Sequence, residues 1–444
     1  MARNNRLYVH FMGIGGSGAS GVALMAKAMG YEVSGCDLAE ITPYLEKVKK
    51  AGIRVFVGHD EGHIKGVDIL TVSPSIMFGN KKHPEVMRAK KVMTWQHFLG
   101  GYLQKGKKVI CVAGTHGKST TTAMAAKLFE DAGLDPWVMI GATVPKWGSN
   151  YRIGKGDYFI TESDEFFDNF LNYKPNIIIL NNIEMDHPDY FKSKRQLFDS
   201  FKKHMESVRS GGVLIANWDD KNVRELVEKI KKKIKVVKYS LGDVSSLVFD
   251  EDGSRFLIGG RKYSLRLPGK YNVSNALGVI ALGKLLRIDE GVIGRSLSSF
   301  SGIGRRMELL GERRGVKVYD DYAHHPTAIR ATLEGLRQKY PHCRIWCVVE
   351  PHSFSRTKKL LKYFKGAFGE ADRVVVGPIF RARDSHDFGI SGADIVDVCG
   401  HKRVEYFEDV DFLITQVKKE ARNGDVVIVM GAGESHKWAR KLLE

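Results

Sequence analysis

Two glycine-rich loops, each placed between a strand-like run and a helical pattern, constrain this chain more than any other feature. The first loop, residues 13–18, follows the apolar run at 7–12. The second, residues 114–120, follows the run at 107–113. Glycines let the backbone approach a phosphate closely, and the N-terminus of the following helix offers free N–H groups to it. The sequence therefore predicts two α/β domains that each bind a phosphorylated ligand.

The first loop has the spacing G-x-G-x-x-G. Its glycines are Gly13, Gly15, Gly16 and Gly18. A helical pattern at 19–29 and a strand at 32–35 follow, and Asp37 stands 19 residues beyond the last glycine. An acid at that place is typical of a nucleotide site, where it binds the ribose. The loop predicts a diphosphate site, and a packing turn without a ligand is the alternative.

The second loop is a compact variant of the Walker pattern. Its residues are Gly114, Thr115, His116, Gly117, Lys118, Ser119 and Thr120. The full pattern would have a glycine where Val112 stands. Lys118 can reach β- and γ-phosphates as a point charge, and the Ser119 hydroxyl can bind Mg²⁺. This loop predicts an ATP site.

Strands and helices alternate along the chain, which predicts an α/β protein with mainly parallel sheets. Composition marks linkers at residues 100–108 and 298–304. Beyond the second linker, strands are expected at 316–319, 345–349, 373–376 and 425–430, and helices at 327–339 and 355–368. We expect a Rossmann-like domain at 1–104, a P-loop ATPase-type domain at 105–301 and a second Rossmann-like domain at 302–444.

The formal net charge of +18 favours an acidic partner such as nucleic acid, anionic lipid or an acidic small molecule. The densest basic run, residues 229–238, contains no aromatic residue on which a base could stack. We interpret it as a solvated helix end that runs into a strand. Nucleic acid is therefore not an expected partner.

Cytoplasmic location is expected, because the N-terminus shows no signal-peptide pattern. The longest apolar runs, at 176–180 and 426–430, are far shorter than a membrane span, so no membrane partner is expected. The five cysteines are an odd number, thinly spread. Cys343 and Cys347 bracket a strand-like run and are interpreted as buried thiols, with a metal or redox pair as the alternative.

Further motifs, taken with the two loops, carry a family resemblance. They are His10 to Gly18, Ala113 to Thr122, Glu162 to Glu165, Asn182 to His187, Pro268 to Asn272 with Asn275, Gly304 to Arg306, Asp320 to Thr327, Pro351 to Thr357 and Gly431 to Gly433. In this order they resemble the Mur ligase family, the ATP-dependent enzymes that build the peptidoglycan stem peptide. The resemblance covers essentially the whole chain. It is closest to the branch that joins L-alanine to the carboxylate of UDP-N-acetylmuramate.

The resemblance implies a ligase that uses ATP and Mg²⁺ and forms an acyl phosphate. It assigns catalytic roles to Lys118, Glu162 and His187, and metal-ligand roles to Ser119, Glu162 and His187. Residues 114–120 would bind ATP together with Asn272, Asn275, Arg306, Asp321 and His324. The family often has a histidine where Tyr271 stands.

The resemblance also implies which residues bind the UDP-sugar and which bind the amino acid. The UDP-sugar would lie on Gly13, Gly15, Gly16, Gly18, Asp37 and Ser73. His352 and Arg356 would bind the amino acid, because a guanidinium fork suits a carboxylate. Ser353 and Glu350 depart from common family patterns of arginine and glutamine. Other members carry a carbamylated lysine, and here Phe201 is expected at that place with Lys202 beside it.

Several alternatives stay open. Within the family, the runner-up is the recycling ligase that attaches a tripeptide to UDP-N-acetylmuramate. Folylpolyglutamate synthase shares the central fold but not the N-terminal loop. Outside the family, the first loop alone would fit an NAD-dependent dehydrogenase, and the charge a non-catalytic basic binding module. A monomer or a homodimer is expected.

Overall fold

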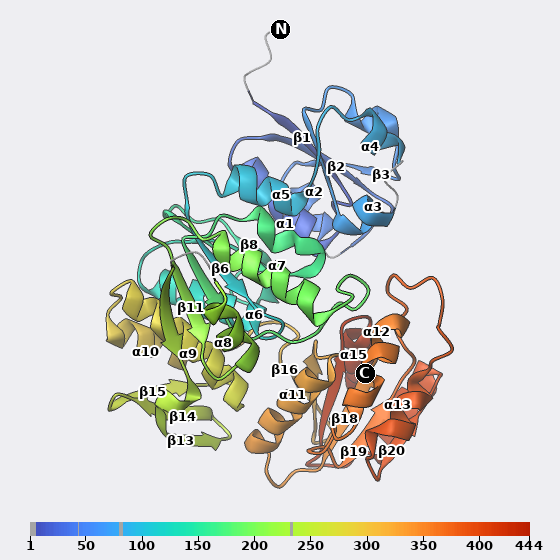
Figure 1. The fold of residues 1–444 in the computed structure, drawn as a ribbon. Coiled ribbons are helices and arrows are strands. Elements are labelled where there is room, and N and C mark those ends of the chain that lie inside the picture. Colours follow the sequence, from blue (N-terminus) through green and yellow to red (C-terminus); the bar gives the residue numbers. More distant parts are fainter. Residues whose placement is uncertain (1–5, 43, 80–82, 231–233) are drawn as a thin grey trace.

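The computed structural model describes residues 6–42, 44–79, 83–230 and 234–444, which form three α/β units (Figure 1). The N-terminal unit, blue, lies at the top of Figure 1. The central unit, cyan to yellow, lies at the lower left, and the C-terminal unit, orange to red, at the lower right. Each unit has a mainly parallel sheet of its own. The predicted α/β class is therefore confirmed.

The N-terminal sheet has five parallel strands in the order β3-β2-β1-β4-β5. They are β1 (Tyr8–Met12), β2 (Glu32–Asp37), β3 (Arg54–Val57), β4 (Ile69–Val72) and β5 (Val92–Thr94). The helices are α1 (Ser17–Ala28), α2 (Leu45–Lys50), η1 (Glu61–Ile64), α3 (Pro74–Gly79), α4 (Pro84–Arg88), α5 (Trp95–Phe98) and η2 (Leu99–Leu103). Because α1 begins at Ser17, the glycine loop runs directly into its first turn, as a phosphate loop requires.

The central sheet has seven strands in the order β12-β11-β10-β6-β9-β7-β8, and only β7 and β8 pair antiparallel. The strands are β6 (Lys108–Ala113), β7 (Trp137–Val144), β8 (Ser149–Arg152), β9 (Tyr158–Ser163), β10 (Ile177–Leu180), β11 (Val213–Asn217) and β12 (Lys235–Tyr239). The helices are α6 (Lys118–Asp131), η3 (Phe166–Asn172), α7 (Lys194–Glu206), α8 (Lys221–Glu228), η4 (Leu241–Asp243), α9 (Lys270–Leu285) and α10 (Glu290–Ser298). The all-apolar β10 is fully buried, as a parallel strand covered on both faces must be.

A small antiparallel sheet extends the central unit. Its strands are β13 (Val244–Asp250), β14 (Gly253–Ile258) and β15 (Arg261–Leu265). β15 lies against α10, and Phe256 and Tyr263 join the core of the central unit. This sheet was not predicted. Its first strand is largely exposed and offers little hydrophobic alternation.

The C-terminal sheet has six strands in the order β16-β17-β21-β18-β19-β20, with β16 and β17 antiparallel. The strands are β16 (Glu308–Arg313), β17 (Val316–Asp321), β18 (Ile345–Glu350), β19 (Arg373–Val376), β20 (Val404–Tyr406) and β21 (Val426–Gly431). The helices are α11 (Pro326–Lys339), α12 (Phe354–Leu360), η5 (Leu361–Phe364), α13 (Gly392–Cys399), α14 (Val410–Glu420) and α15 (Ser435–Leu443). The helix predicted at 355–368 is wrong in its second half. It changes to a 3₁₀ turn at Leu361, and Gly366 then takes a positive φ of 69° that an α-helix does not allow.

The linker predicted at 100–108 is also wrong in part. Residues 99–103 form the π-helical turn η2, and the Leu103 side chain is fully buried in the core shared with the N-terminal sheet. The glycines at 100, 101 and 106 suggested a linker, although Leu103 between them is a core residue. The segment at 298–304 does lie between α10 and β16, but Phe300 and Ile303 are buried. The strands of the four sheets fall within 1–104, 105–301 and 302–444, with two sheets in the second range, and those boundaries stay a prediction.

The basic run at 229–238 begins at the C-terminal end of α8 and continues into β12, where Lys235 and Lys238 are exposed; residues 231–233 fall outside the described residues. All five cysteines are free, and four are buried, whereas Cys343 is half-buried and precedes β18. Among the described residues, no helix has the length and apolar character needed to cross a bilayer.

Candidate active site at the junction of the three units

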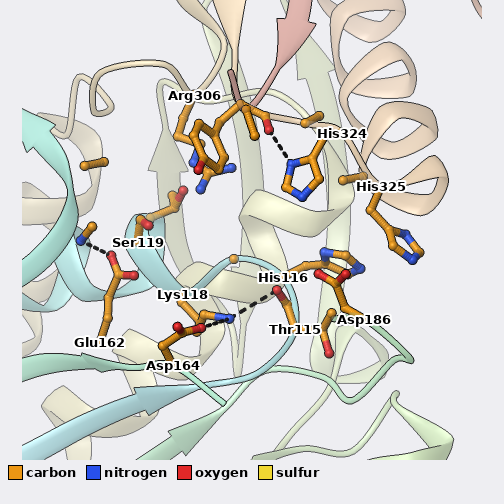
Figure 2. Close-up of a pocket in the computed structure, with 18 of the residues that line it drawn as sticks. Thr115, His116, Lys118, Ser119, Glu162, Asp164, Asp186, Arg306, His324 and His325 are labelled. Atoms are coloured by element: carbon orange, nitrogen blue, oxygen red, sulfur yellow. Dashed lines mark hydrogen bonds and ion pairs between the residues drawn. The ribbon is translucent and has the colours of Figure 1, made fainter. Parts of the chain in front are cut away.

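A cleft of about 1410 Å³ is lined by residues from all three units. Gly18 and Trp95 come from the N-terminal unit, the loop after β6 from the central unit, and His324 and Arg356 from the C-terminal unit. Figure 2 shows the centre of this cleft, where the side chains of Lys118, Asp164 and Asp186 stand near the phosphate loop. The cleft can therefore hold several substrates at one place.

Strand order explains why acidic side chains surround the phosphate loop. β6 lies between β10 and β9, and all three strands run parallel. Their carboxyl ends therefore meet at one edge of the sheet, where open α/β sheets bind ligands. The loop follows β6, the acidic motif at 162–165 ends β9, and the motif at 182–187 follows β10.

The phosphate loop needs its glycines for conformation and for space. Gly114 has φ 135° and Gly117 has φ 79°, both left-handed values that favour glycine. A Cβ at Gly117 would lie 2.5 Å from Asn275 Oδ1. Thr115 Oγ1 donates to the carbonyl of Glu184 at 3.0 Å and ties the loop to the segment after β10. The loop is therefore held in shape without a ligand.

Lys118 is surrounded by carboxylates. Its Nζ donates to Glu165 Oε2 at 2.8 Å and to the Gly114 carbonyl at 2.7 Å, and it lies 3.7 Å from Asp164 Oδ1. Burial opposes the charged form, but these carboxylates outweigh it and raise the pKa of Lys118 above its usual value. The ammonium group is thus kept charged at the position where a phosphate would lie.

The predicted metal ligands fall into two groups, Ser119 with Glu162 and, separately, His187. Glu162 Oε1 accepts from the Gly141 backbone N–H at 2.7 Å, and burial raises the pKa of this carboxyl. Ser119, on the first turn of α6, is buried and hydrogen-bonds Glu162. His187 instead forms a group with Asp164 and Glu165, whose candidate ligand atoms lie within 4.8 Å of one another.

This acidic group fits a hard cation. Glu165 is 1% exposed, yet its Oε1 has no hydrogen-bond partner, and its ion-pair contact is His187 Nε2 at 4.0 Å. A buried carboxylate oxygen is costly to leave unpaired, and carboxylate oxygens are the ligands that Mg²⁺ prefers. Asp164 and Glu165 extend the predicted set of Ser119, Glu162 and His187, which stays a prediction.

Arg356 reaches from α12 across to the central unit. Its Nε forms an ion pair with Asp186 Oδ1 at 3.1 Å, its Nη2 lies 3.0 Å from His187 Nδ1, and its Nη1 lies 3.4 Å from His352 Nδ1. Burial opposes ionisation of Asp186, but His187 and Arg356 hold its pKa well below the usual range. Burial and then Arg356 lower the pKa of His352 to about 4, so this ring is neutral near pH 7.

The two departures from family patterns have local explanations. Ser353 caps α12: its Oγ accepts from the Arg356 N–H at 3.3 Å and donates to Asp384 at 2.8 Å. Glu350 accepts from three backbone N–H groups, of Gly433, Glu434 and Ser435, at 2.9–3.1 Å. A carboxylate has two oxygens for these donors, whereas a glutamine has one.

The first glycine loop is held by Asp37. Asp37 Oδ2 accepts from the Gly15 N–H at 2.8 Å, and a Cβ at Gly15 would lie 2.8 Å from the same oxygen. Gly13 has φ 80° and lies beside Ser73. Of the predicted UDP-sugar residues, Gly18 lines the cleft, whereas Gly13, Gly15, Gly16, Asp37 and Ser73 are not among its lining residues. Their role stays a prediction.

The predicted nucleotide residues of the later motifs do line the cleft. Asn272 and Asn275 are buried on α9, and Asn272 Nδ2 donates to the Pro268 carbonyl at 2.8 Å. Asp321 accepts from the Met307 and Ala323 N–H groups, both at 2.7 Å, and burial raises its pKa. The other members of this set are Arg306, which stacks on Tyr322, and His324, which bonds the Tyr322 carbonyl.

Sequence reasoning missed the acids that complete the site. Asp164, Glu165 and Asp186 stand inside the two motifs at 162–165 and 182–187, but no role was assigned to them. The available signal was that Asp164 and Glu165 directly follow the buried strand β9 and that Asp186 lies in the segment after β10. It also missed a second group, His116, Glu184 and His325, whose candidate ligand atoms lie within 4.8 Å of one another.

Phe201 is fully buried on α7 against Phe170, with ring centroids 5.3 Å apart. Lys202 is half-buried on the next position of the helix. The equivalence of Phe201 to the carbamylated lysine of other members stays a prediction, as does an unmodified Lys202.

Known protein families and curated proteins match this chain along nearly its whole length. Three family models match: "Mur ligase family, catalytic domain" at residues 8–98, "Mur ligase middle domain" at 112–283 and "Mur ligase, glutamate ligase domain" at 305–433. The UDP-N-acetylmuramate--L-alanine ligase of Alkaliphilus metalliredigens is 35% identical, over 98% of this chain and 97% of that protein. The protein of the same name from Caldicellulosiruptor saccharolyticus is 36% identical over 98% and 97%.

Solved structures give the same picture. A UDP-N-acetylmuramate-alanine ligase from Thermotoga maritima has a TM-score of 0.79 at 26% identity and covers 98% of both chains. A murein peptide ligase from Psychrobacter arcticus has a TM-score of 0.69 at 25% identity, also with 98% of both chains covered.

Proposed function

We infer, from the premise that this chain belongs to the Mur ligase family, that it joins L-alanine to the carboxylate of UDP-N-acetylmuramate with ATP. The observation that carries this is the 35–36% identity to enzymes of that activity over nearly the whole length of both chains. The reaction belongs to peptidoglycan precursor synthesis. Family membership accounts for both glycine loops. A dehydrogenase would account for the first loop but not for the second.

The chemistry has two steps. The sugar carboxylate attacks the γ-phosphorus of ATP, which forms an acyl phosphate and releases ADP. The amine of L-alanine then attacks the acyl carbonyl, loses a proton, and phosphate leaves. The protein contributes little covalent chemistry, so its work is to neutralise charge and to hold the reactants in line.

Lys118 neutralises the transferred phosphoryl group. Glu165 and the Gly114 carbonyl accept hydrogen bonds from its ammonium group. Bound phosphates compete with these partners, and the loop N–H groups add to the same field. Asn272, Asn275, Arg306, Asp321 and His324 hold the rest of the nucleotide.

Mg²⁺ would be held by Ser119, Glu162 and His187, with Asp164 and Glu165 close enough to take part. When bound, it supplies positive charge that stabilises the phosphate oxygens. The buried Glu165 Oε1, which has no hydrogen-bond partner, supports this proposal.

The amino acid enters beside Arg356. Its carboxylate pairs with the guanidinium fork, and the neutral His352 ring lies alongside at 3.4 Å. This leaves the amine free to face the acyl carbonyl. The UDP-sugar lies on the first glycine loop, whose last glycine, Gly18, reaches the cleft. Cytoplasmic location and a monomeric or homodimeric state stay predictions.

The test is phosphate release from ATP in the presence of UDP-N-acetylmuramate and one amine at a time. We expect L-alanine to give the highest kcat/KM among L-alanine, glycine, L-serine and the tripeptide, with no release when the sugar nucleotide is omitted. Preference for the tripeptide would instead establish the recycling activity, and this chain is also similar to a murein peptide ligase. Release that does not depend on UDP-N-acetylmuramate would overturn the proposal.

A further inference from the structure

A cluster of potential metal ligands lies in the N-terminal unit, outside the cleft. It consists of His10 on β1, Cys36 on β2, His63 on η1 and Glu85 on α4, and one ligand atom from each lies within 4.8 Å of the others. His10, Cys36 and Glu85 are 0% exposed, and the His63 side chain is 15% exposed. None of the four lines the cleft described above.

The fold brings these residues to one face of the sheet. In the parallel pair of β1 and β2, His10 is opposite Ser34 and Met12 is opposite Cys36. Side chains two positions apart share a face, so His10 and Cys36 point to the same side. The alternate residues of β1 join the core that includes α1, while η1 and α4, which contact each other, supply His63 and Glu85 (Figure 1).

His10 has the hydrogen-bond pattern of a metal-ligating histidine. Its Nδ1 lies 2.8 Å from Ser34 Oγ, which is itself 2.7 Å from Tyr8 Oη. Its Nε2 is buried and has no hydrogen-bond partner. A polar atom buried without a partner is destabilising and calls for an explanation. A ligating histidine holds one nitrogen with an outer partner and gives the other to the metal.

We propose that His10, Cys36, His63 and Glu85 bind one Zn²⁺ ion. Imidazole nitrogen, thiolate sulfur and carboxylate oxygen are the donors that zinc takes, and four protein ligands with no open position are typical of a structural site. Bond lengths of about 2.0–2.3 Å set tetrahedral edges of about 3.3–3.8 Å. The present spread of 4.8 Å therefore closes with side-chain shifts on the order of 1 Å.

A hydrogen-bonded network without metal accounts for only part of the cluster. Glu85 Oε1 accepts from the Asp60 N–H at 2.9 Å and lies 3.2 Å from His63 Nδ1. Cys36 Sγ lies 3.5 Å from Glu85 Oε1 and 3.2 Å from His59 Nδ1, which is itself 3.7 Å from Glu85 Oε2. These contacts satisfy Glu85, but they leave His10 Nε2 unpaired. A zinc ion would satisfy all four groups together.

The position of Cys36 gives the ion a structural consequence. The Cys36 carbonyl accepts from the N–H groups of Gly13 and Ile14 at 2.8 and 3.1 Å, at the start of the glycine loop. Metal bound to the Cys36 side chain would therefore fix the strand on which that loop rests.

The test uses the full chain, stripped of metal and titrated with Co²⁺ under anaerobic conditions. Cobalt bound to a thiolate absorbs in the near ultraviolet by sulfur-to-metal charge transfer. The two acid–histidine groups in the cleft contain no cysteine, so they cannot produce this band. We expect one equivalent to develop the band, and Zn²⁺ to displace the cobalt and abolish it.

Cys36→Ser should lose the band, whereas the matched control Cys343→Ser, outside the cluster, should keep it. Ser34→Ala should keep the band and bind cobalt about 10–100-fold more weakly, as expected for loss of an outer partner. If Cys36→Ser does not fold, His63→Ala replaces it, because His63 is the most exposed of the four side chains. This variant should weaken cobalt binding at least tenfold, or about 1.4 kcal/mol. No band in the wild type, a band that survives Cys36→Ser, or unchanged affinity in His63→Ala would each overturn the proposal.

Discussion

Arg356 Nε lies 3.1 Å from Asp186 Oδ1, an ion pair between residues 170 positions apart (356 − 186) that joins the C-terminal unit to the central one. Both side chains are about one-tenth exposed. The same guanidinium touches His187, a predicted metal ligand, and His352. The residue proposed to bind the amino acid therefore also connects the closing unit to the phosphate site.

Arg356→Ala should raise the KM for L-alanine by about 10- to 150-fold, because a charge-assisted hydrogen bond contributes about 1.5–3 kcal/mol. The KM values for ATP and UDP-N-acetylmuramate should change much less. Arg356→Lys should recover only part of the loss, since a point charge cannot reproduce the fork. Lys358→Ala removes an exposed charge from the same helix and serves as the control. An unchanged KM for L-alanine with a raised KM for ATP would move Arg356 to the nucleotide site.

Lys118→Ala should reduce kcat by at least about 100-fold, because it removes a preorganised charge from a site sheltered from water. It also leaves Glu165 without its cation. The matched control is Lys127→Ala, on the same helix but paired with Asp131. Single-turnover measurement of acyl phosphate formation checks the step. Wild-type turnover by Lys118→Ala would exclude its role.

Glu162→Gln and His187→Ala should raise the Mg²⁺ concentration required for half-maximal activity. Each removes or weakens one ligand, which should cost at least as much metal affinity as the loss of an outer partner does, about 10–100-fold. Glu334→Gln, at an exposed position of α11, is the control for loss of a carboxylate. Activity titrated against Mg²⁺ at saturating substrates decides the assignment. If both variants keep the wild-type requirement, the metal lies on Asp164 and Glu165 instead.

Gly15→Ala should raise the KM for UDP-N-acetylmuramate while the KM for ATP stays nearly unchanged. The new Cβ would lie 2.8 Å from Asp37 Oδ2, so the loop must separate from Asp37. Gly294→Ala is the control, because a Cβ there meets nothing within 4 Å. Equal effects on both KM values would show a general loss of folding rather than a local one.

His204 should make stability depend on pH. It is fully buried, stacks on Phe170 and bonds Ser163 at 3.1 Å, and burial lowers its pKa from 6.5 to about 3. Below pH 6.5 the unfolded chain binds a proton that the folded chain does not, so this residue's contribution falls as the pH falls. Relative to His204→Gln, the wild type should lose about 2 kcal/mol of unfolding free energy between pH 7 and pH 5. Denaturant unfolding at both pH values measures the difference, and a constant difference would contradict the prediction.

Local sequence patterns were enough to predict the strands and helices that flank the two glycine loops. An apolar run, then glycines, then a helical periodicity predicted β1 and α1 around the first loop, and β6 and α6 around the second. The same holds for α11, which begins one residue before its predicted start. The π-helical turn η2 was missed because its glycines resemble a linker, whereas Leu103 is held by contacts distant in the sequence.

The sequence by itself determined the two phosphate loops, their order and the residue types available for the chemistry, because these depend on backbone conformation within a few residues. Only the tertiary structure decided which of those residues meet. Placing β6 between β10 and β9 sets Glu165 against Lys118, and docking of the C-terminal unit sets Arg356 against Asp186. Pairing β1 with β2 under η1 and α4 likewise gathers His10, Cys36, His63 and Glu85. Such contacts depend on strand order and domain packing, which the hydrophobic pattern of one chain segment does not encode.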